Sequence, residues 1–173
     1  DGPISVVGGG GVLSASEAAR WERAWIEQDS CAKGGINQLT VVLQTNAPLF
    51  AGSTVVISGL DTATALDSTV AITGLSAGSV FNPVGLWSDP GSFTAIVAST
   101  SDPGQFLVFS FQVRNPSQDS TGVTPTVRAL GSSSTIVVPQ RTMTSPNNIP
   151  PWVLVVGLDP VIAGIMAGSS QVY

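Results

Sequence analysis

The pattern of apolar and polar positions changes near residue 37. Beyond that point apolar residues alternate with polar ones, or form short apolar runs, between turn sequences such as NAP, SDPG and RNPSQDS. In QFLVFSFQV, alternation places Leu107, Phe109, Phe111 and Val113 on one face, directed into a core. About seven short strands without intervening helices predict a mainly β fold, a β-sandwich of Ig-like or Greek-key type. The predicted strands are residues 38–45, 53–59, 68–74, 93–99, 105–113, 125–130 and 134–140.

The N-terminal region has a different period and predicts an α-helix over residues 14–29. Ser14 and Glu17 have the S-x-x-E spacing of a capping box. Apolar residues then recur at steps of three and four, which is typical of one helical face. They are Ala18, Ala19, Trp21, Trp25 and Ile26. Two indoles on a lone helix need a surface to pack against, which is either the chain's own sandwich or a neighbouring molecule.

A glycine run precedes this region, in ISVVGGGGVLSASEAARWERAW (residues 4–25). A dinucleotide-binding unit also begins with a strand, a glycine cluster and a helix. However, the third glycine of G-x-G-x-x-G is replaced by Leu13 or Ser14 in either register. The repeated β-α-β units of that fold are also missing from the pattern. The run is interpreted as a hinge, and no cofactor is predicted.

The C-terminal segment is strongly apolar. Gly157, Asp159 and Pro160 interrupt it, so it is too short for a membrane span, and WVLVVGL is better interpreted as a buried strand. We therefore divide the chain into an N-terminal assembly segment (1–36), a sandwich (37–147) and a C-terminal assembly segment (148–173).

Charged residues are scarce. Only 10% of the 173 residues are charged, against roughly 25% in an ordinary soluble domain. Apolar residues make up 43% and the mean hydropathy is +0.35. The 22 Ser and 15 Thr must supply much of the polar surface. A net charge of −5 from few, dispersed charges excludes a nucleic-acid partner.

Catalytic and metal-binding constellations are missing from the sequence. Without any His, neither a Ser-His-Asp triad nor a histidine metal site can form. The single cysteine, Cys31, is either a free, partly buried thiol or a link to another chain. Asp61, Asp67, Asp89 and Asp102 lack a D-x-D-x-D pattern, so they are interpreted as turn residues rather than calcium ligands. The chain is predicted not to be an enzyme and to hold no metal.

Several motifs resemble a repeat of large secreted and cell-surface proteins of algae and other protists. The matching stretches are residues 39–46, LFAGSTVVISGL (49–60), Gly85 with Trp87, FSFQVRNP (109–116) and PTV (125–127). The resemblance covers about residues 38–140. It implies an extracellular β-sandwich with a structural or adhesive role and no catalytic residues.

One sandwich with two apolar ends predicts a secreted or cell-surface subunit that assembles head-to-tail into a filament, by strand exchange between copies. The predicted assembly residues are Ile4, Val6, Val7, Trp21, Trp25, Trp152, Leu154, Val156 and Ile162. The alternative is a carbohydrate-binding or adhesive module, in which Trp87 and the loop Asp residues contact the ligand; otherwise Trp87 packs on the sandwich. Residues 131–135 and 142–146 offer attachment points for O-linked sugars, or are plain solvated turns.

Overall fold

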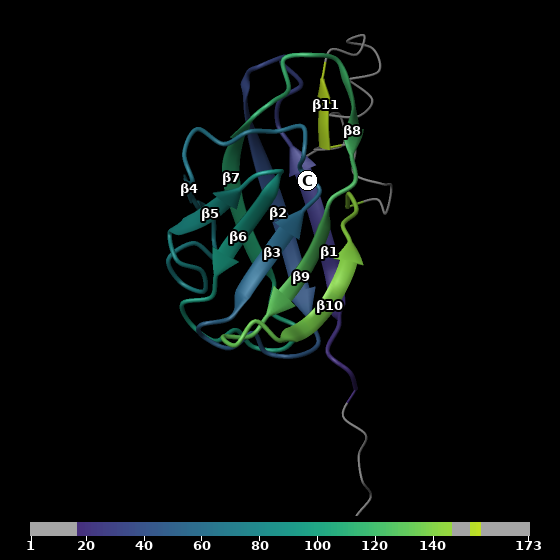
Figure 1. The fold of residues 1–173 in the computed structure, drawn as a ribbon. Coiled ribbons are helices and arrows are strands. Elements are labelled where there is room, and N and C mark those ends of the chain that lie inside the picture. The colour runs from purple at the N-terminus through teal and green to yellow at the C-terminus, as the bar shows by residue number, and fades with distance from the viewer. Residues whose placement is uncertain (1–16, 147–152, 157–173) are drawn as a thin grey trace, which may run out of the picture.

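Two β-sheets packed face to face form the body of the molecule in a computed structural model that describes residues 17–146 and 153–156 (Figure 1). The rear sheet of this view has the order β1–β2–β7, and the front sheet has the order β10–β9–β3–β6–β5–β4. The rear strands are β1 (Trp21–Gln28), β2 (Ile36–Thr45) and β7 (Leu107–Arg114). The front strands are β3 (Thr54–Ser58), β4 (Thr69–Ala71), β5 (Val84–Ser88), β6 (Ser92–Ile96), β9 (Thr126–Leu130) and β10 (Ile136–Thr142). A separate pair, β8 (Ser120–Val123) with β11 (Val153–Val156), lies at the upper end.

The predicted β-sandwich is confirmed, and all seven predicted strands occur. They are β2, β3, β4, β6, β7, β9 and β10. Burial alternates regularly in β2, β6 and β9, and the four residues of β7 that the alternation directs into the core are buried. Two further strands, β5 and β8, were not predicted. The apolar WVLVVGL segment contains β11, which pairs with β8 of the same chain.

The predicted helix over residues 14–29 is wrong within the part of the chain that the structure describes, because Trp21–Gln28 form strand β1. The sequence WERAWIEQ also suits a strand: Trp21, Ala24 and Ile26 are buried, and a bulge between Trp21 and Arg23 corrects the phase. Antiparallel pairing with β2 along the whole strand outweighs the local helical pattern. The sandwich therefore includes residues that were assigned to the N-terminal segment. Across residues 17–146 and 153–156, no helix could cross a membrane.

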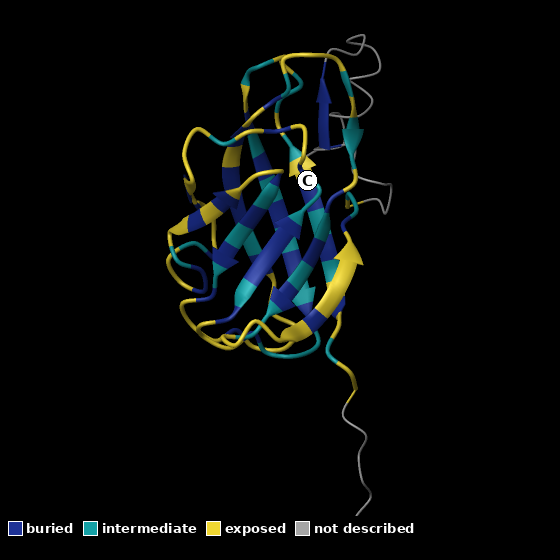
Figure 2. Ribbon diagram, in the orientation of Figure 1, coloured by how far each residue is buried: buried dark blue, intermediate teal, exposed yellow. Residues whose placement is uncertain are grey.

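The core lies between the inner faces of the two sheets, where buried positions alternate with exposed ones along the strands (Figure 2). Phe93 of the front sheet stacks on Phe111 of the rear sheet, with ring centroids 3.9 Å apart. Phe81 meets Phe109 edge-on at 4.9 Å. Gly85 makes room for this cluster, since a Cβ there would lie 2.5 Å from the Phe93 ring. The aromatic contacts thus join the two sheets.

The chain crosses between the sheets at both sides of the sandwich. After β10 it pairs with β1 in parallel, through Ile26 N–H to Thr144 O (3.0 Å) and Thr144 N–H to Ala24 O (2.8 Å). On the opposite side, Thr64 pairs with Arg114 and Thr73 pairs with Ser110, so the segment around β4 also borders β7. These crossings pair parts of the outer edges of β1 and β7.

Candidate functional site

The outer surface of the front sheet carries almost no charge. We define the front face as the outward side chains of β9, β3, β6, β5 and β4. Arg128 is the only charged residue among them, and the others are hydroxyl or aliphatic. They are Thr126, Arg128, Leu130, Thr54, Val56, Ser58, Ser92, Thr94, Ile96, Val84, Leu86, Ser88, Thr69 and Ala71.

Strand register orders this face into rows. Ser58 lies opposite Thr126, Ser92 lies opposite Ser88, and the Ser58 and Ser92 hydroxyls are 3.4 Å apart. The next row joins Arg128, Val56, Thr94, Leu86 and Thr69 across the strands. Rows of hydroxyls and methyl groups on paired strands form a nearly uncharged surface.

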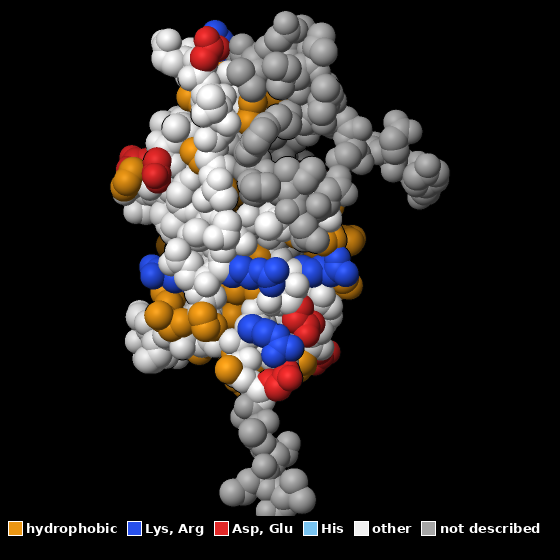
Figure 3. Space-filling model, turned by 90° about the vertical axis from the view of Figure 1, so that its right-hand side faces the viewer, with side chains coloured by type: hydrophobic (Ala, Val, Ile, Leu, Met, Phe, Trp, Pro, Cys, Tyr) orange, Lys and Arg blue, Asp and Glu red, His pale blue; other side chains and the backbone are white. Residues whose placement is uncertain are grey.

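The front face continues onto the exposed edge strand β10, where Ile136 and Val137 are 65% and 37% exposed. Figure 3 looks onto this edge and shows a line of basic side chains with apolar ones beside it. Two neighbouring strands supply arginines here: Arg141 on β10 and Arg128 on β9. Arg141 donates to the Trp21 carbonyl (2.5 Å), whereas the buried Nε of Arg128 has no hydrogen-bond partner within the described residues. The Nε–H of Arg128 is therefore a hydrogen-bond donor without a partner among the described residues, and it lies beside the apolar rows of the front face.

The geometry is that of a β-sandwich with a broad, nearly uncharged outer face. No family model and no curated protein matches the chain. Solved structures resemble it in fold. One is a chain of the CaDoc0917–CaCohA2 complex (10% identity, TM-score 0.41, 71% of this chain and 98% of that chain). Another is an uncharacterised Nocardia farcinica protein with an immunoglobulin-like fold (14%, 0.43, 78% and 99%). A third is a non-cellulosomal cohesin from the archaeon Archaeoglobus fulgidus (17%, 0.38, 71% and 92%).

The outer surface of the rear sheet differs in chemistry, and we call it the rear face. At one end the Arg23 guanidinium lies 4.5 Å from the Trp25 ring centroid and 5.3 Å from that of Phe106. Trp25 continues across the sheet to Val42 and Val108. Within the described residues, Arg23 takes part in neither of the two ion pairs. The rings hold this cation in place and leave its N–H groups without a carboxylate.

Polar residues occupy the other end of the rear face. The Thr40 and Ser110 hydroxyls are 2.9 Å apart, and beyond them Gln38 lies opposite Gln112. A groove of about 310 Å³ opens beside this glutamine pair. It lies where the chain between Thr64 and Thr73 arches away from β7. The floor includes the buried Phe111 and Val70, and the walls include Asp67, Thr69 and Leu66.

A buried amide network ties the upper end of the sandwich together. Asn37 donates to Asn115 Oδ1 at 2.7 Å, and Asn115 donates to the Ser30 and Ala32 carbonyls. Gln28 extends the network to β11: its Oε1 accepts the Leu154 N–H and its Nε2 donates to Val155 O at 3.3 Å. The Gln28 side-chain amide thus forms the two hydrogen bonds that the backbone of a neighbouring strand would form at the edge of β11.

The predicted assembly residues have different positions. Trp21 is 3% exposed and lies in the core, so it cannot be an exposed assembly contact in this fold. Leu154 and Val156 are buried in β11, which pairs within the same chain rather than lying free. Trp25 is half-buried and faces outward on β1. Ile4, Val6, Val7, Trp152 and Ile162 lie outside the described residues.

Trp87 is not an exposed glycan contact. It is 8% exposed, and its indole N–H donates to Asp89 Oδ1 at 3.1 Å, so the expected packing on the sandwich holds instead.

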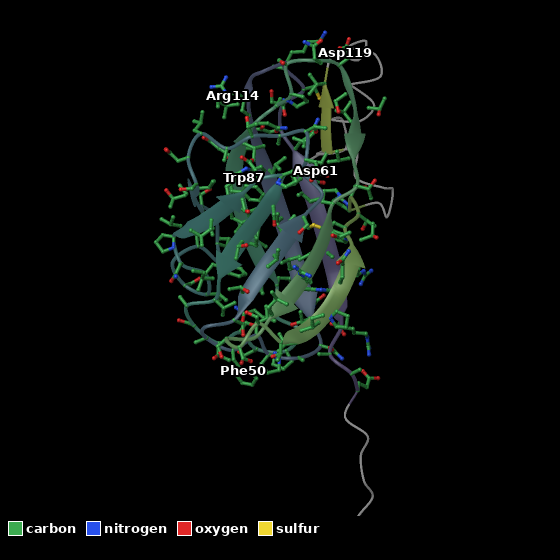
Figure 4. The ribbon with its side chains drawn as sticks, viewed as in Figure 1. Phe50, Asp61, Trp87, Arg114 and Asp119 are labelled. Atoms are coloured by element: carbon green, nitrogen blue, oxygen red, sulfur yellow. The ribbon has the colours of Figure 1, made fainter. Side chains whose placement is uncertain are left out.

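Figure 4 shows Phe50 at the opposite end of the molecule from Arg114 and Asp119. Cys31 is free and half-buried, and its Sγ accepts a hydrogen bond from Gln28 at 3.1 Å. Among the described residues, no three carboxylate, thiol or imidazole groups come together.

Neither face was recognised in the sequence. The front face requires β5, whose sequence VGLWS contains a glycine and resembles a turn, and it requires the register of five strands. The signal that was available is compositional. The outward positions of β3 and β6, two of the predicted strands, hold Thr, Ser, Val or Ile, whereas exposed strands commonly carry charged residues at such positions.

Proposed function

We propose that this chain is a non-catalytic, extracellular adhesive module that binds a protein partner through its front face. The observation that carries the proposal is the single charge, Arg128, among the outward side chains of five paired strands. Interface centres are depleted in charged residues, and exposed apolar patches mark interaction sites. Leu86 and Val84, 47% and 44% exposed, are the most exposed large aliphatic residues on this face.

The remaining composition agrees with this role. The sequence has no His and one Cys, so the imidazole that most often acts as the general base is missing, and a cysteine nucleophile would have no histidine partner. Its many hydroxyl residues, its scarcity of Lys and its resemblance to secreted repeats support an extracellular location.

A charge placed at the centre of the front face tests this function. Thr94→Lys puts an ammonium group beside Val56 and Leu86, where a docked protein would bury it without a partner. Ser99→Lys adds the same charge to an exposed loop at the end of the sandwich and serves as the control. Adhesion of protein-coated beads to the surface of the source cells is the measurement. Thr94→Lys should weaken adhesion by on the order of a hundredfold.

Protease treatment of the cell surface should remove the adhesion that depends on Thr94, and glycosidase treatment should leave it. Equal adhesion by wild type and Thr94→Lys would refute the front-face proposal, as would loss of that adhesion on deglycosylation alone.

A self-assembling filament subunit is the second candidate. The observation that favours it is β11, a strand of four buried apolar residues that lies outside both main sheets. The β8 edge and the Gln28 amide would accept β11 of another copy through the same contacts, which is strand exchange. Negative-stain microscopy of the full chain and of a chain lacking residues 1–11 or 151–173 tests it. Regular filaments of the full chain, lost in one deletion, support the candidate; a monodisperse monomer excludes it.

A further inference from the structure

The rear face combines the groups that recognise an uncharged polyhydroxyl chain. We infer that it binds a neutral oligosaccharide, laid from the groove beside Gln112 to the Arg23–Trp25–Phe106 cluster. This inference is independent of the front-face proposal, since the two faces lie on opposite sides of the sandwich and share only Thr69 and Ala71, at the β4 edge.

The groove supplies the first contact region. The side-chain amides of Gln38 and Gln112 both line it and, within the described residues, neither forms a hydrogen bond. Each amide offers two donors and an acceptor, which matches a hydroxyl pair on a sugar ring. The Thr69 and Thr73 side chains and the Asp67 carboxylate add further polar groups. Phe111 and Val70 form an apolar floor suited to the C–H face of a sugar.

The aromatic cluster supplies the second contact region. Trp25 and Phe106 present apolar ring surface and edges, and Phe106 is 49% exposed. Because Arg23 is held by the rings and not by a carboxylate, its N–H groups remain available to hydroxyl oxygens. Val42 and Val108 lie between this cluster and the hydroxyl pair of Thr40 and Ser110.

The two regions are aligned along one strand. Gln38 and Val42 are four residues apart on β2 and share its outward side, so they lie about 13 Å apart. A linear ligand along this direction meets amides first, then the Thr40 hydroxyl with the buried Ser110 beside it, then methyl groups and aromatic rings. A disaccharide would occupy only the groove beside Gln112, whereas a longer chain would also reach the aromatic cluster.

The charges on this face favour a neutral ligand over an acidic one. The cations are Arg23 and Arg114, and the latter donates to the Gly34 carbonyl at 2.8 Å. The carboxylates of Glu27, Asp29 and Asp67 are on or next to the same face. With three carboxylates against two guanidinium groups, an acidic polysaccharide gains no net attraction.

Titration with defined sugars tests the inference. Hexasaccharides and disaccharides of β-1,4-glucose, β-1,3-glucose, α-mannose and β-galactose are titrated into the full chain by calorimetry, with an acidic polyuronate hexasaccharide alongside. We expect at least one neutral hexasaccharide to bind, with an affinity that changes less than threefold between 50 and 500 mM NaCl.

Variants then locate the site. Gln112→Ala, at an exposed position, should weaken hexasaccharide and disaccharide binding by on the order of tenfold. Trp25→Ala should weaken hexasaccharide binding by about 30-fold and leave disaccharide binding unchanged. Thr94→Ala, on the front face, is the matched control and should bind as wild type does. Circular dichroism melting identifies any variant that is unfolded. If Trp25→Ala is unfolded, sugar binding by Gln112→Ala alone decides whether the site is on the rear face.

Three results would overturn the inference. They are no binding of any neutral hexasaccharide by the wild type, wild-type affinity in Gln112→Ala, or preferential binding of the polyuronate with loss at high salt. Front-face adhesion would be unaffected by any of these, so failure here and failure of the proposed function are distinguishable.

Discussion

Gly91 lies in the tight connection between β5 and β6, where two separate demands exclude a side chain. Its φ is +60°, in the left-handed region, and an added Cβ would lie 2.2 Å from the Leu60 carbonyl carbon. Its carbonyl also accepts the Leu60 N–H at 2.9 Å. Gly104 has a similar φ of +74°, but no atom lies within 4 Å of its Cβ position. At Gly104 only the backbone conformation disfavours a side chain, whereas at Gly91 the neighbouring backbone also leaves no space for one.

Alanine substitution at these two glycines should have unequal costs. Gly104→Ala should lower the free energy of unfolding by about 1–2 kcal/mol, the cost of a left-handed alanine. Gly91→Ala should cost about 3 kcal/mol or more, because the Leu60 backbone must also move. Urea denaturation followed by fluorescence measures both. Equal costs would mean that the close approach at Leu60 is relieved without strain.

Single side chains also decide which surface a residue belongs to. Trp21 and Trp25 are four residues apart, yet Trp21 is buried against the core and donates to Pro139 O at 3.0 Å, while Trp25 stacks on Arg23. The sequence pattern placed both on one helical face. In a strand with a bulge after Trp21, they point to opposite faces.

At the scale of elements, β11 is held at its inner edge by one side chain. Gln28 accepts the Leu154 N–H and donates to Val155 O, while β8 supplies the pairing on the other edge. Leu154 has a φ of 63°, which is unfavourable for leucine, so the strand relies on these contacts.

Removing the Gln28 amide should release β11 selectively. In Gln28→Ala, the Leu154 N–H loses its acceptor, and leaving a buried donor unpaired costs about 1–3 kcal/mol. Hydrogen exchange at Leu154 should then accelerate by about 10- to 100-fold, while Val41 in β2 stays protected. Gln44→Ala is the control, since it removes an amide that donates to Gly104 O at 2.7 Å, away from β11. Unchanged exchange at Leu154 would show that β8 alone holds the strand.

Alternation predicted the seven strands because each has one face in a core, and burial follows the period of two. It could not predict β5, where Gly85 replaces an inward side chain to admit the Phe93 ring, a constraint set by a distant residue. The helix prediction failed for a similar reason, because the pairing of β1 with β2 is non-local. The front face and the rear face both depend on register, which the sequence pattern alone does not specify.

At the scale of the whole molecule, few charges keep copies apart. The net charge is −5, and the sequence pI is about 4.3. Protonation of carboxylates between pH 7 and pH 4.3 brings the net charge to zero and removes the mutual repulsion. The front face, with Arg128 as its single charge, offers no comparable repulsion.

Self-association should therefore be greatest near pH 4.3 and reverse on return to pH 7. Dynamic light scattering measures it, and circular dichroism at each pH checks that the chain stays folded. Thr94→Lys should reduce the association more than Ser99→Lys, although both add one charge. A particle size that is constant from pH 4 to pH 8 would contradict this expectation.

The parallel pairing between β1 and the chain after β10, which we call the seam, determines how the molecule responds to tension. Residues at the start of β1 lie at the lower end of the molecule and β11 lies at the upper end (Figure 1). Tension between the two ends would load β1 and the parallel Thr144 segment in opposite directions along their common axis. Their hydrogen bonds, together with those of Arg141 and Trp21 across the same seam, would then bear the load in shear and rupture together rather than successively. A domain built this way resists pulling on its two ends.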